Sequence, residues 1–195
     1  QQNSGVNTAA RQAEKLFAEG SYALAQESYA KAGKLQLPAA DRRWVDFRLA
    51  DTLWRAQAGS ATADSSKFDE ARRQLEALVA AAPRPEERDR TLAEARESLG
   101  DFWWLRREQR NWSQAWEHYR QALDWWAGSS NLRESRVRYI GMVKRMVQPP
   151  GIEPYYYYGY YGNLLPADTV RKALSIAETN ADKACLHYLL AMAPA

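Results

Sequence analysis

The chain has little of the residue types on which most catalytic and metal sites depend. Its 195 residues include one cysteine, Cys185, and two histidines, His118 and His187. A single cysteine excludes an intrachain disulfide and leaves the redox compartment open. Cys185 and His187 are two positions apart and would point to different faces of a helix, so they do not have metal-ligand spacing. We therefore expect no metal site and no cofactor.

Long apolar runs and a strong net charge are also absent. No apolar stretch approaches the roughly 20 residues of a membrane-spanning helix, so we expect no membrane span. The net charge of +3 is too small to indicate a nucleic-acid partner. The basic excess lies between Arg106 and Arg145. It would suit an acidic partner, although a solvated helix face is the commoner origin of such a pattern.

Motifs that would indicate an enzyme are weak. Ser28 and Lys31 match the Ser-x-x-Lys of serine hydrolases, but the companion motifs are missing and both residues fall among helix-packing positions. No glycine-rich phosphate loop occurs. Acidic residues alternate with Arg and Lys at helical spacing, which is typical of surface pairs. We predict no catalytic residues, and we predict that the protein is not an enzyme.

Apolar and aromatic side chains at helical spacing are abundant. Hydrophobic residues make up 46% of the chain, with 8 tryptophans and 11 tyrosines, which predicts a soluble protein with an aromatic core. The clearest helical unit spans residues 93–127. A small residue in each half, Gly100 and Ala115, would let two helices cross closely, with large residues three or four positions away filling the gaps.

Similar units recur along the chain. We expect them at residues 8–38, 41–83, 93–127 and 131–179, with the start of a further unit at 182–192. In the second halves of two units the same spacing of Ala, Tyr and Ala appears, at residues 25, 29 and 32 and at residues 115, 119 and 122. Two segments depart from the pattern. The polar insertion from Gln57 to Lys67 is expected to form a mobile loop, and residues 149–165 form a Pro/Tyr/Gly-rich loop.

The unit at residues 93–127 resembles a tetratricopeptide (TPR) repeat. Leu99-Gly100 stands where that family has its Leu-Gly pair, and Trp112, Ala115, Tyr119 and Ala122 match the aromatic and small positions of its second helix. The resemblance implies an all-α fold over residues 1–195: a single right-handed solenoid of antiparallel helix pairs, with the Tyr-rich loop near its C-terminal end. It also implies a protein–protein interaction scaffold, whose partner is another protein or another domain of the same chain.

The resemblance also indicates candidate partner-binding residues, because the first helices of successive TPR units line the inner face of the array. Alternatively, the residues at these positions are ordinary surface residues. Carried over position by position, the candidates are Glu14, Asp51, Arg55, Asp101, Trp104, Arg138, Met142 and Arg145.

A narrower resemblance is to the N-terminal region of very large secreted bacterial alpha-2-macroglobulin-like proteins. It rests on residues 49–54 (Leu-Ala-Asp-Thr-Leu-Trp), on residues 100–104 (Gly-Asp-Phe-Trp-Trp) and on the tyrosine tract. It implies the N-terminal segment of a larger exported bacterial protein, without protease-trapping chemistry. The polar start at Gln1 fits a mature end left by signal-peptide removal and equally a cut boundary. We expect a secreted or periplasmic location, with the cytoplasm as the alternative.

Six tyrosines lie within residues 155–161, with no helical period. Such rings can stack on sugars, which gives an alternative function, carbohydrate or cell-wall binding, with Tyr156, Tyr158 and Tyr160 as the candidate aromatic surface. The other interpretation is an aromatic plug over the gap in the broken fourth unit. We predict the plug for at least half of these rings.

Overall fold

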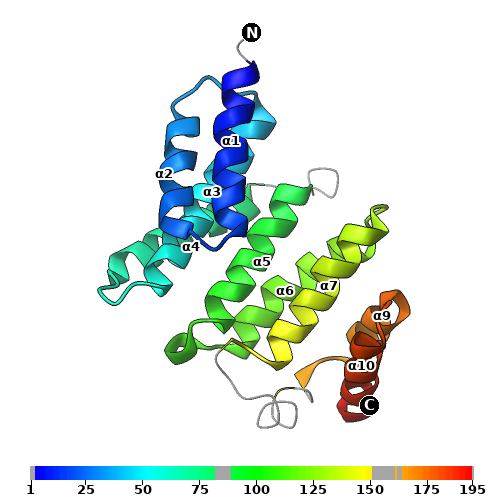
Figure 1. The fold of residues 1–195 in the computed structure, drawn as a ribbon. Helices are drawn as coiled ribbons and strands as arrows, with labels where there is room; N and C mark the ends of the chain where they lie inside the picture. Colours follow the sequence, from blue (N-terminus) through cyan, green and yellow to red (C-terminus); the bar gives the residue numbers. More distant parts are fainter. Residues whose placement is uncertain (1–2, 82–88, 151–160, 162–163, 195) are drawn as a thin grey trace. The chain divides into compact units, whose positions relative to one another are not determined.

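The computed structural model describes residues 3–81, 89–150, 161 and 164–194, and for residues 3–9 the backbone only. Within these ranges all regular structure is helical, with no strand, so the all-α prediction is confirmed (Figure 1). One 3-10 turn, Arg107–Gln109, accompanies nine α-helices in the described ranges. The α-helices are α1 (Asn3–Ala18), α2 (Tyr22–Gly33), α3 (Ala39–Ala58), α4 (Ser65–Ala80), α5 (Arg90–Trp104), α6 (Trp112–Ala127), α7 (Leu132–Val147), α9 (Ala167–Ile176) and α10 (Asn180–Met192).

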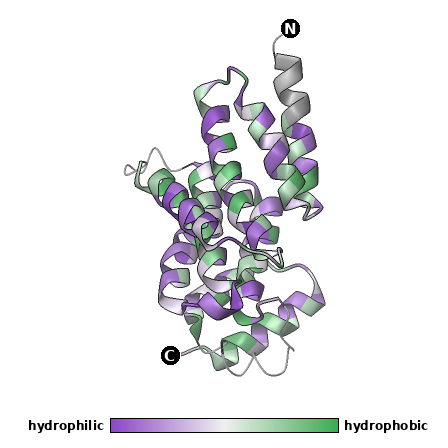
Figure 2. Ribbon diagram, turned by 90° about the vertical axis from the view of Figure 1, so that its left-hand side faces the viewer, coloured by the Kyte–Doolittle hydropathy of each residue, from purple (hydrophilic) through white to green (hydrophobic). Residues whose placement is uncertain are grey.

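The chain divides into two compact units, Gln1–Phe102 and Trp103–Ala195. The division falls near the C-terminal end of α5, inside the unit that the sequence predicts at residues 93–127. In both units hydrophobic and hydrophilic residues alternate along the same helices, as Figure 2 shows. Such amphipathic helices must bury one face against other helices, which is why the helical period in the sequence leads to helix-on-helix packing.

In the first unit, each helix from α1 to α4 packs against the next one along the chain. The turn between α1 and α2 requires a glycine, because Gly20 has a φ of +77°. Ser21 donates its backbone N–H to the carbonyl of Leu16 and Gly20 donates to Phe17, which is the hydrogen-bond pattern of a Schellman helix end. This compact turn brings Ala13 and Ala25 into one fully buried cluster with Tyr29.

The second unit has a larger and more continuous apolar core. Here α6 packs against α7, α7 against α9, and α9 against α10. The core draws on all four helices and is rich in methionine and aromatic side chains, with Met142, Met146 and Tyr119 at 0% exposure. Leu165, which leads into α9, is equally buried and anchors the start of that helix.

The connection between α3 and α4 is shorter than the sequence predicts. The expected loop from Gln57 to Lys67 is wrong at both ends, because α3 continues through Ala58 and α4 begins at Ser65. Asp64 starts α4 early by accepting a hydrogen bond from the Ser66 N–H at 2.9 Å. The Gln57 side chain accepts from the Asp64 N–H at 2.9 Å and ties the two helix ends together.

Candidate functional site

Three first helices of the predicted pairs share a five-residue pattern: a small residue, an acidic residue, any residue, a large apolar residue and an aromatic residue. The acidic members, Glu14, Asp51 and Asp101, are three of the predicted partner-binding residues. The pattern occupies residues 13–17 on α1, 50–54 on α3 and 100–104 on α5, reading Ala-Glu-Lys-Leu-Phe, Ala-Asp-Thr-Leu-Trp and Gly-Asp-Phe-Trp-Trp.

The structure joins these acids through two arginines of α3. Arg48 contacts Glu14 with Nη2 at 3.0 Å from Oε2, and its Nη1 lies 3.9 Å from Asp51 Oδ2. Arg55 bonds Asp51 through Nε at 2.9 Å and Asp101 through Nη2 at 2.8 Å. Acid and arginine therefore alternate from α1 through α3 to α5, and we call these five residues the ionic chain.

Glu14 sits at one end of the ionic chain, where three different side chains donate to it. Besides Arg48, the Tyr29 hydroxyl donates to Oε1 at 2.5 Å and the Trp44 indole N–H at 2.7 Å. Burial alone would raise the pKa of Glu14, but the hydrogen bond and charge of Arg48, with the Tyr29 and Trp44 bonds, lower it below 4.5. Burial and the bond to Glu14 raise the pKa of Tyr29.

Asp51 occupies the middle of the ionic chain and is 1% exposed. Its Oδ1 accepts from the Ser98 hydroxyl as well as from Arg55, while its buried Oδ2 accepts no hydrogen bond from any described residue. Burial would lower the pKa of Arg55, but the charges of Asp51 and Asp101 raise it. Arg55 therefore lies between two opposite charges within the ionic chain.

Each aromatic residue that closes the five-residue pattern contacts an arginine. The guanidinium carbon of Arg48 lies 3.6 Å from the Phe17 ring centroid, and that of Arg55 lies 4.4 Å from Trp54. In the second unit, Arg110 lies 5.3 Å from Trp104. The arginine stems thus also cover apolar surface at these positions.

The indole N–H groups of the two equivalent tryptophans are satisfied in parallel ways. Trp54 Nε1 donates to the Ser98 hydroxyl on α5 at 3.0 Å. Trp104 Nε1 donates to the carbonyls of Arg145 and Met146 on α7, at 3.1 and 3.0 Å. In each case a tryptophan near the end of one first helix contacts the next first helix.

The structure buries four of the predicted partner-binding residues and leaves the other four partly exposed. In the first unit the four candidates meet in the ionic chain, with exposed side-chain fractions of 38% for Glu14 and 15% for Arg55, while Asp51 and Asp101 are buried. In the second unit Trp104 and Met142 are buried, and Trp104 donates a hydrogen bond to the Arg145 carbonyl. The guanidinium carbon of Arg138 lies 5.3 Å from the Trp126 ring centroid. Their role in partner binding stays a prediction.

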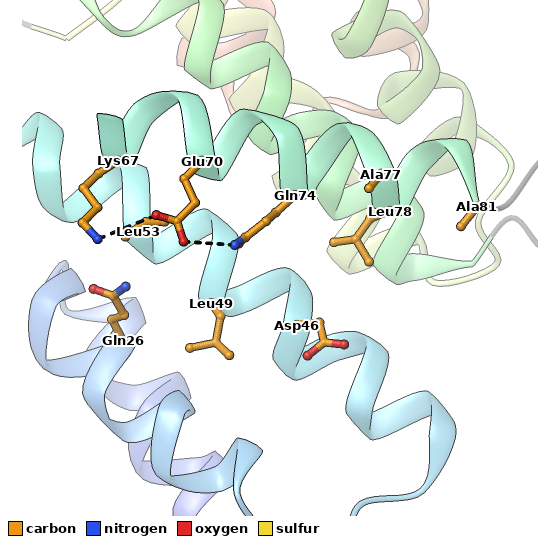
Figure 3. Close-up of a pocket in the computed structure, with 10 residues that line it drawn as sticks. All are labelled: Gln26, Asp46, Leu49, Leu53, Lys67, Glu70, Gln74, Ala77, Leu78 and Ala81. Carbon is orange, nitrogen blue, oxygen red and sulfur yellow. Dashed lines mark hydrogen bonds and ion pairs between the residues drawn. The ribbon is translucent and has the colours of Figure 1, made fainter. Parts of the chain in front are cut away.

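A groove in the first unit was not predicted from the sequence. It lies between α2, α3 and α4, as Figure 3 shows. Its volume is about 600 Å³. Leu49, Leu53 and Leu78 form its apolar part. Asp46, Leu49 and Leu53 follow one another at helical spacing along α3, on a different face from the buried Ala50 and Trp54, and that spacing is the signal that could have indicated the groove.

The tyrosine tract lies almost wholly outside the described residues, including Tyr156, Tyr158 and Tyr160. Its described member, Tyr161, packs edge-on against Trp104 with ring centroids 4.8 Å apart. The plug stays a prediction.

Among the described residues, no group of three or more His, Cys, Asp or Glu side chains is placed to hold a metal ion. No helix in the described part of the chain is long and apolar enough to span a bilayer.

The fold and the site define an all-helical protein whose first unit contains an ionic chain that joins α1, α3 and α5. Compared with known proteins, the chain matches no protein-family model, no curated protein and no solved structure.

Proposed function

We propose that this chain is a TPR-like array, a right-handed solenoid of antiparallel helix pairs, that works as a protein–protein interaction scaffold. The observation that carries the proposal is the five-residue pattern repeated on α1, α3 and α5, whose members take corresponding roles in packing. Repetition of one packing unit is the defining property of solenoid proteins, and solenoids present extended surfaces to partners.

The second helices support the same repeat register. Ala25, Tyr29 and Ala32 on α2 are all 0% exposed, and so are their counterparts on α6 at the same spacing, residues 115, 119 and 122. On α4 the corresponding buried positions are Ala71 and Leu75. A small–large–small series on the buried face of a helix lets its neighbour approach closely and fixes the crossing point.

A scaffold is favoured over an enzyme because every charged group of the ionic chain contacts an opposite charge within it. Two arginines stand between three carboxylates, and all five groups contact opposite charges within the chain. An active site requires the reverse arrangement, with charged groups left to act on a substrate. We place the scaffold in the N-terminal region of a larger exported bacterial protein of alpha-2-macroglobulin-like type, bound to another protein or to a domain of its own chain.

Selection from a display library of bacterial protein fragments against the whole chain tests this function. We expect fragments that bind with micromolar or tighter affinity and do not bind a control helical protein of similar size and charge. Failure to recover any such fragment would remove the proposal. Photo-crosslinking of a recovered fragment would then identify the helices that bind it.

Glycan binding is a second candidate, favoured by the arrangement of Trp112 and Trp116. These partly exposed rings on α6 are nearly parallel, with centroids 5.9 Å apart and an interplanar angle of 7°. Aromatic faces of this kind can stack on sugar rings. Isothermal titration with soluble cell-wall glycan fragments separates the two functions. Only glycan binding predicts a heat of binding for the unchanged chain that is lost in Trp116→Ala.

A further inference from the structure

The groove between α2, α3 and α4 combines an apolar floor with two polar ends of different character. Leu49 and Leu53 of α3 form the floor, and Leu78 of α4 adds to it. At one end Lys67 and Glu70 pair with each other at 3.7 Å, and Gln74 donates to Glu70 at 3.4 Å. That end is therefore largely satisfied within the chain.

The opposite end of the groove is lined by small residues and one carboxylate. Ala77 of α4 and Ala81, the residue directly after this helix, are both exposed, and Asp46 of α3 lies across from them (Figure 3). Asp46 is exposed and forms no ion pair with any residue in the described ranges. Small residues one turn apart allow a second helix to approach α4 closely.

The shape and chemistry of the groove favour a helix over other occupants. Its walls are helices whose backbone groups are bonded internally, so an extended strand would find no backbone partners. A small polar ligand would lack convergent buried polar groups, because the polar groups present lie at the two ends. The lining along α4 and its C-cap runs from Lys67 to Ala81, about 21 Å at 1.5 Å per residue, which matches a partner helix of about four turns.

We propose that this groove binds an amphipathic helix of another protein, with apolar side chains on Leu49, Leu53 and Leu78 and a lysine or arginine facing Asp46. The small pair Ala77 and Ala81 accepts the partner backbone, and the unpaired carboxylate fixes the direction in which the helix lies. This inference rests on the proposed scaffold function and names the class of partner.

The test uses the whole chain and a phage-displayed library of 15-residue helical peptides, with a fixed Ala/Glu/Lys frame and one randomised face. We expect selected peptides to carry large apolar residues at i, i+3 or i+4, and i+7, with a basic residue one turn beyond them. Fluorescence anisotropy of a labelled selected peptide then gives the affinity.

Two variants at exposed positions probe the groove without disturbing the fold. Ala77→Arg fills the close-approach site and Asp46→Lys reverses the charge, and each should weaken binding roughly tenfold or more. Ala80→Arg and Asp41→Lys are matched controls at exposed positions of the same two helices that do not line the groove. They should leave the affinity within about twofold. A peptide with its basic residue changed to Glu should regain binding to Asp46→Lys.

The outcomes separate this inference from the scaffold function. Peptides that bind Ala77→Arg and Asp46→Lys as well as the unchanged chain would overturn the groove as their site and leave the scaffold function standing. Absence of any selected peptide, together with absence of binding fragments, would remove both proposals. Concentration-dependent dimerisation that Ala77→Arg abolishes would make a second copy of this chain the occupant, which also overturns the inference.

Discussion

The two units of this chain hold their helices together with different kinds of side chain. In the first unit the first helices are joined by the ionic chain, in which Asp51 is buried between two arginines. In the second unit the predicted partner-binding residue on α7 is not an acid but Met142, which is buried in an apolar core. A buried ion pair contributes little net stability over an apolar contact, but it becomes costly when one partner is lost. The stability of the first unit should therefore be sensitive to loss of a charged group, and that of the second unit to loss of side-chain volume.

This difference gives the largest expected effect. Arg55→Ala removes the guanidinium that contacts both Asp51 and Asp101, so we expect the free energy of unfolding to fall by about 3–5 kcal/mol. Met142→Ala should cost a similar amount, about 2–5 kcal/mol, but through the cavity that it leaves. Urea denaturation, with hydrogen exchange to assign the loss to α3 or α7, measures both.

A matched control for the arginine is Arg120→Ala, since Arg120 forms an exposed pair with Glu117 at 2.8 Å. Exposed pairs contribute at most about 1 kcal/mol. If Arg55→Ala were as mild as this control, the ionic chain would not hold the first unit together.

The two equivalent tryptophans test whether the units share one repeat. Trp54→Phe and Trp104→Phe each remove an indole N–H donor from a buried site, and each should cost about 1–3 kcal/mol. Trp116→Phe, at a partly exposed position of α6, is the control and should cost less. Thermal unfolding of the three variants makes the comparison, and a large cost for only one of the two buried tryptophans would break the equivalence.

Acid should affect the first unit through Glu14. Its folded-state pKa is lowered, so the stabilisation is fully present above the ordinary value of 4.5 and is lost as the pH falls through the lower folded value. Glu14→Gln should remove this part of the pH dependence. In the second unit, a hydrogen bond from Lys144 lowers the pKa of Asp182, but that pair lies near the surface and should contribute less.

Denaturation midpoints between pH 3 and pH 7, compared among the unchanged chain, Glu14→Gln and Asp182→Asn, check this assignment. A Glu14→Gln variant whose stability falls with pH as steeply as that of the unchanged chain would show that other carboxylates control the acid response.

The helical class could be predicted from the sequence, because period and small-residue spacing are local signals. Their spacing placed Ala25, Tyr29 and Ala32 on one packing face of a helix, and all three are fully buried. Only part of the candidate site could be predicted from the sequence. Family positions indicated Asp51 and Asp101, but not that Arg55 would fold between them, because that contact joins residues 46 positions apart.

The spacing of Asp46, Leu49 and Leu53 could have indicated one wall of the groove. Its other walls depend on how α2 and α4 are placed about α3, which local spacing does not determine. The early start of α4 was missed for a simpler reason. Ser65, Ser66 and Lys67 read as loop residues by composition, yet the Asp64 cap makes them the first turn of a helix.

The smallest expected effect concerns the connection between α3 and α4, where the two helix ends are already close. Gln57 Oε1 accepts from the Asp64 N–H at 2.9 Å, so the exposed residues between them are not needed to span a gap. Deleting Ala61, Thr62 and Ala63 keeps Gly59 and the Asp64 cap. It should change the free energy of unfolding by no more than about 0.5 kcal/mol, with a slight gain from the shorter loop. Asp64→Ala, which removes the cap and leaves the loop length unchanged, should be the more damaging change. Thermal denaturation of the two variants checks the order, and a deletion that destabilises more than Asp64→Ala would show that these exposed residues help to hold the first unit together.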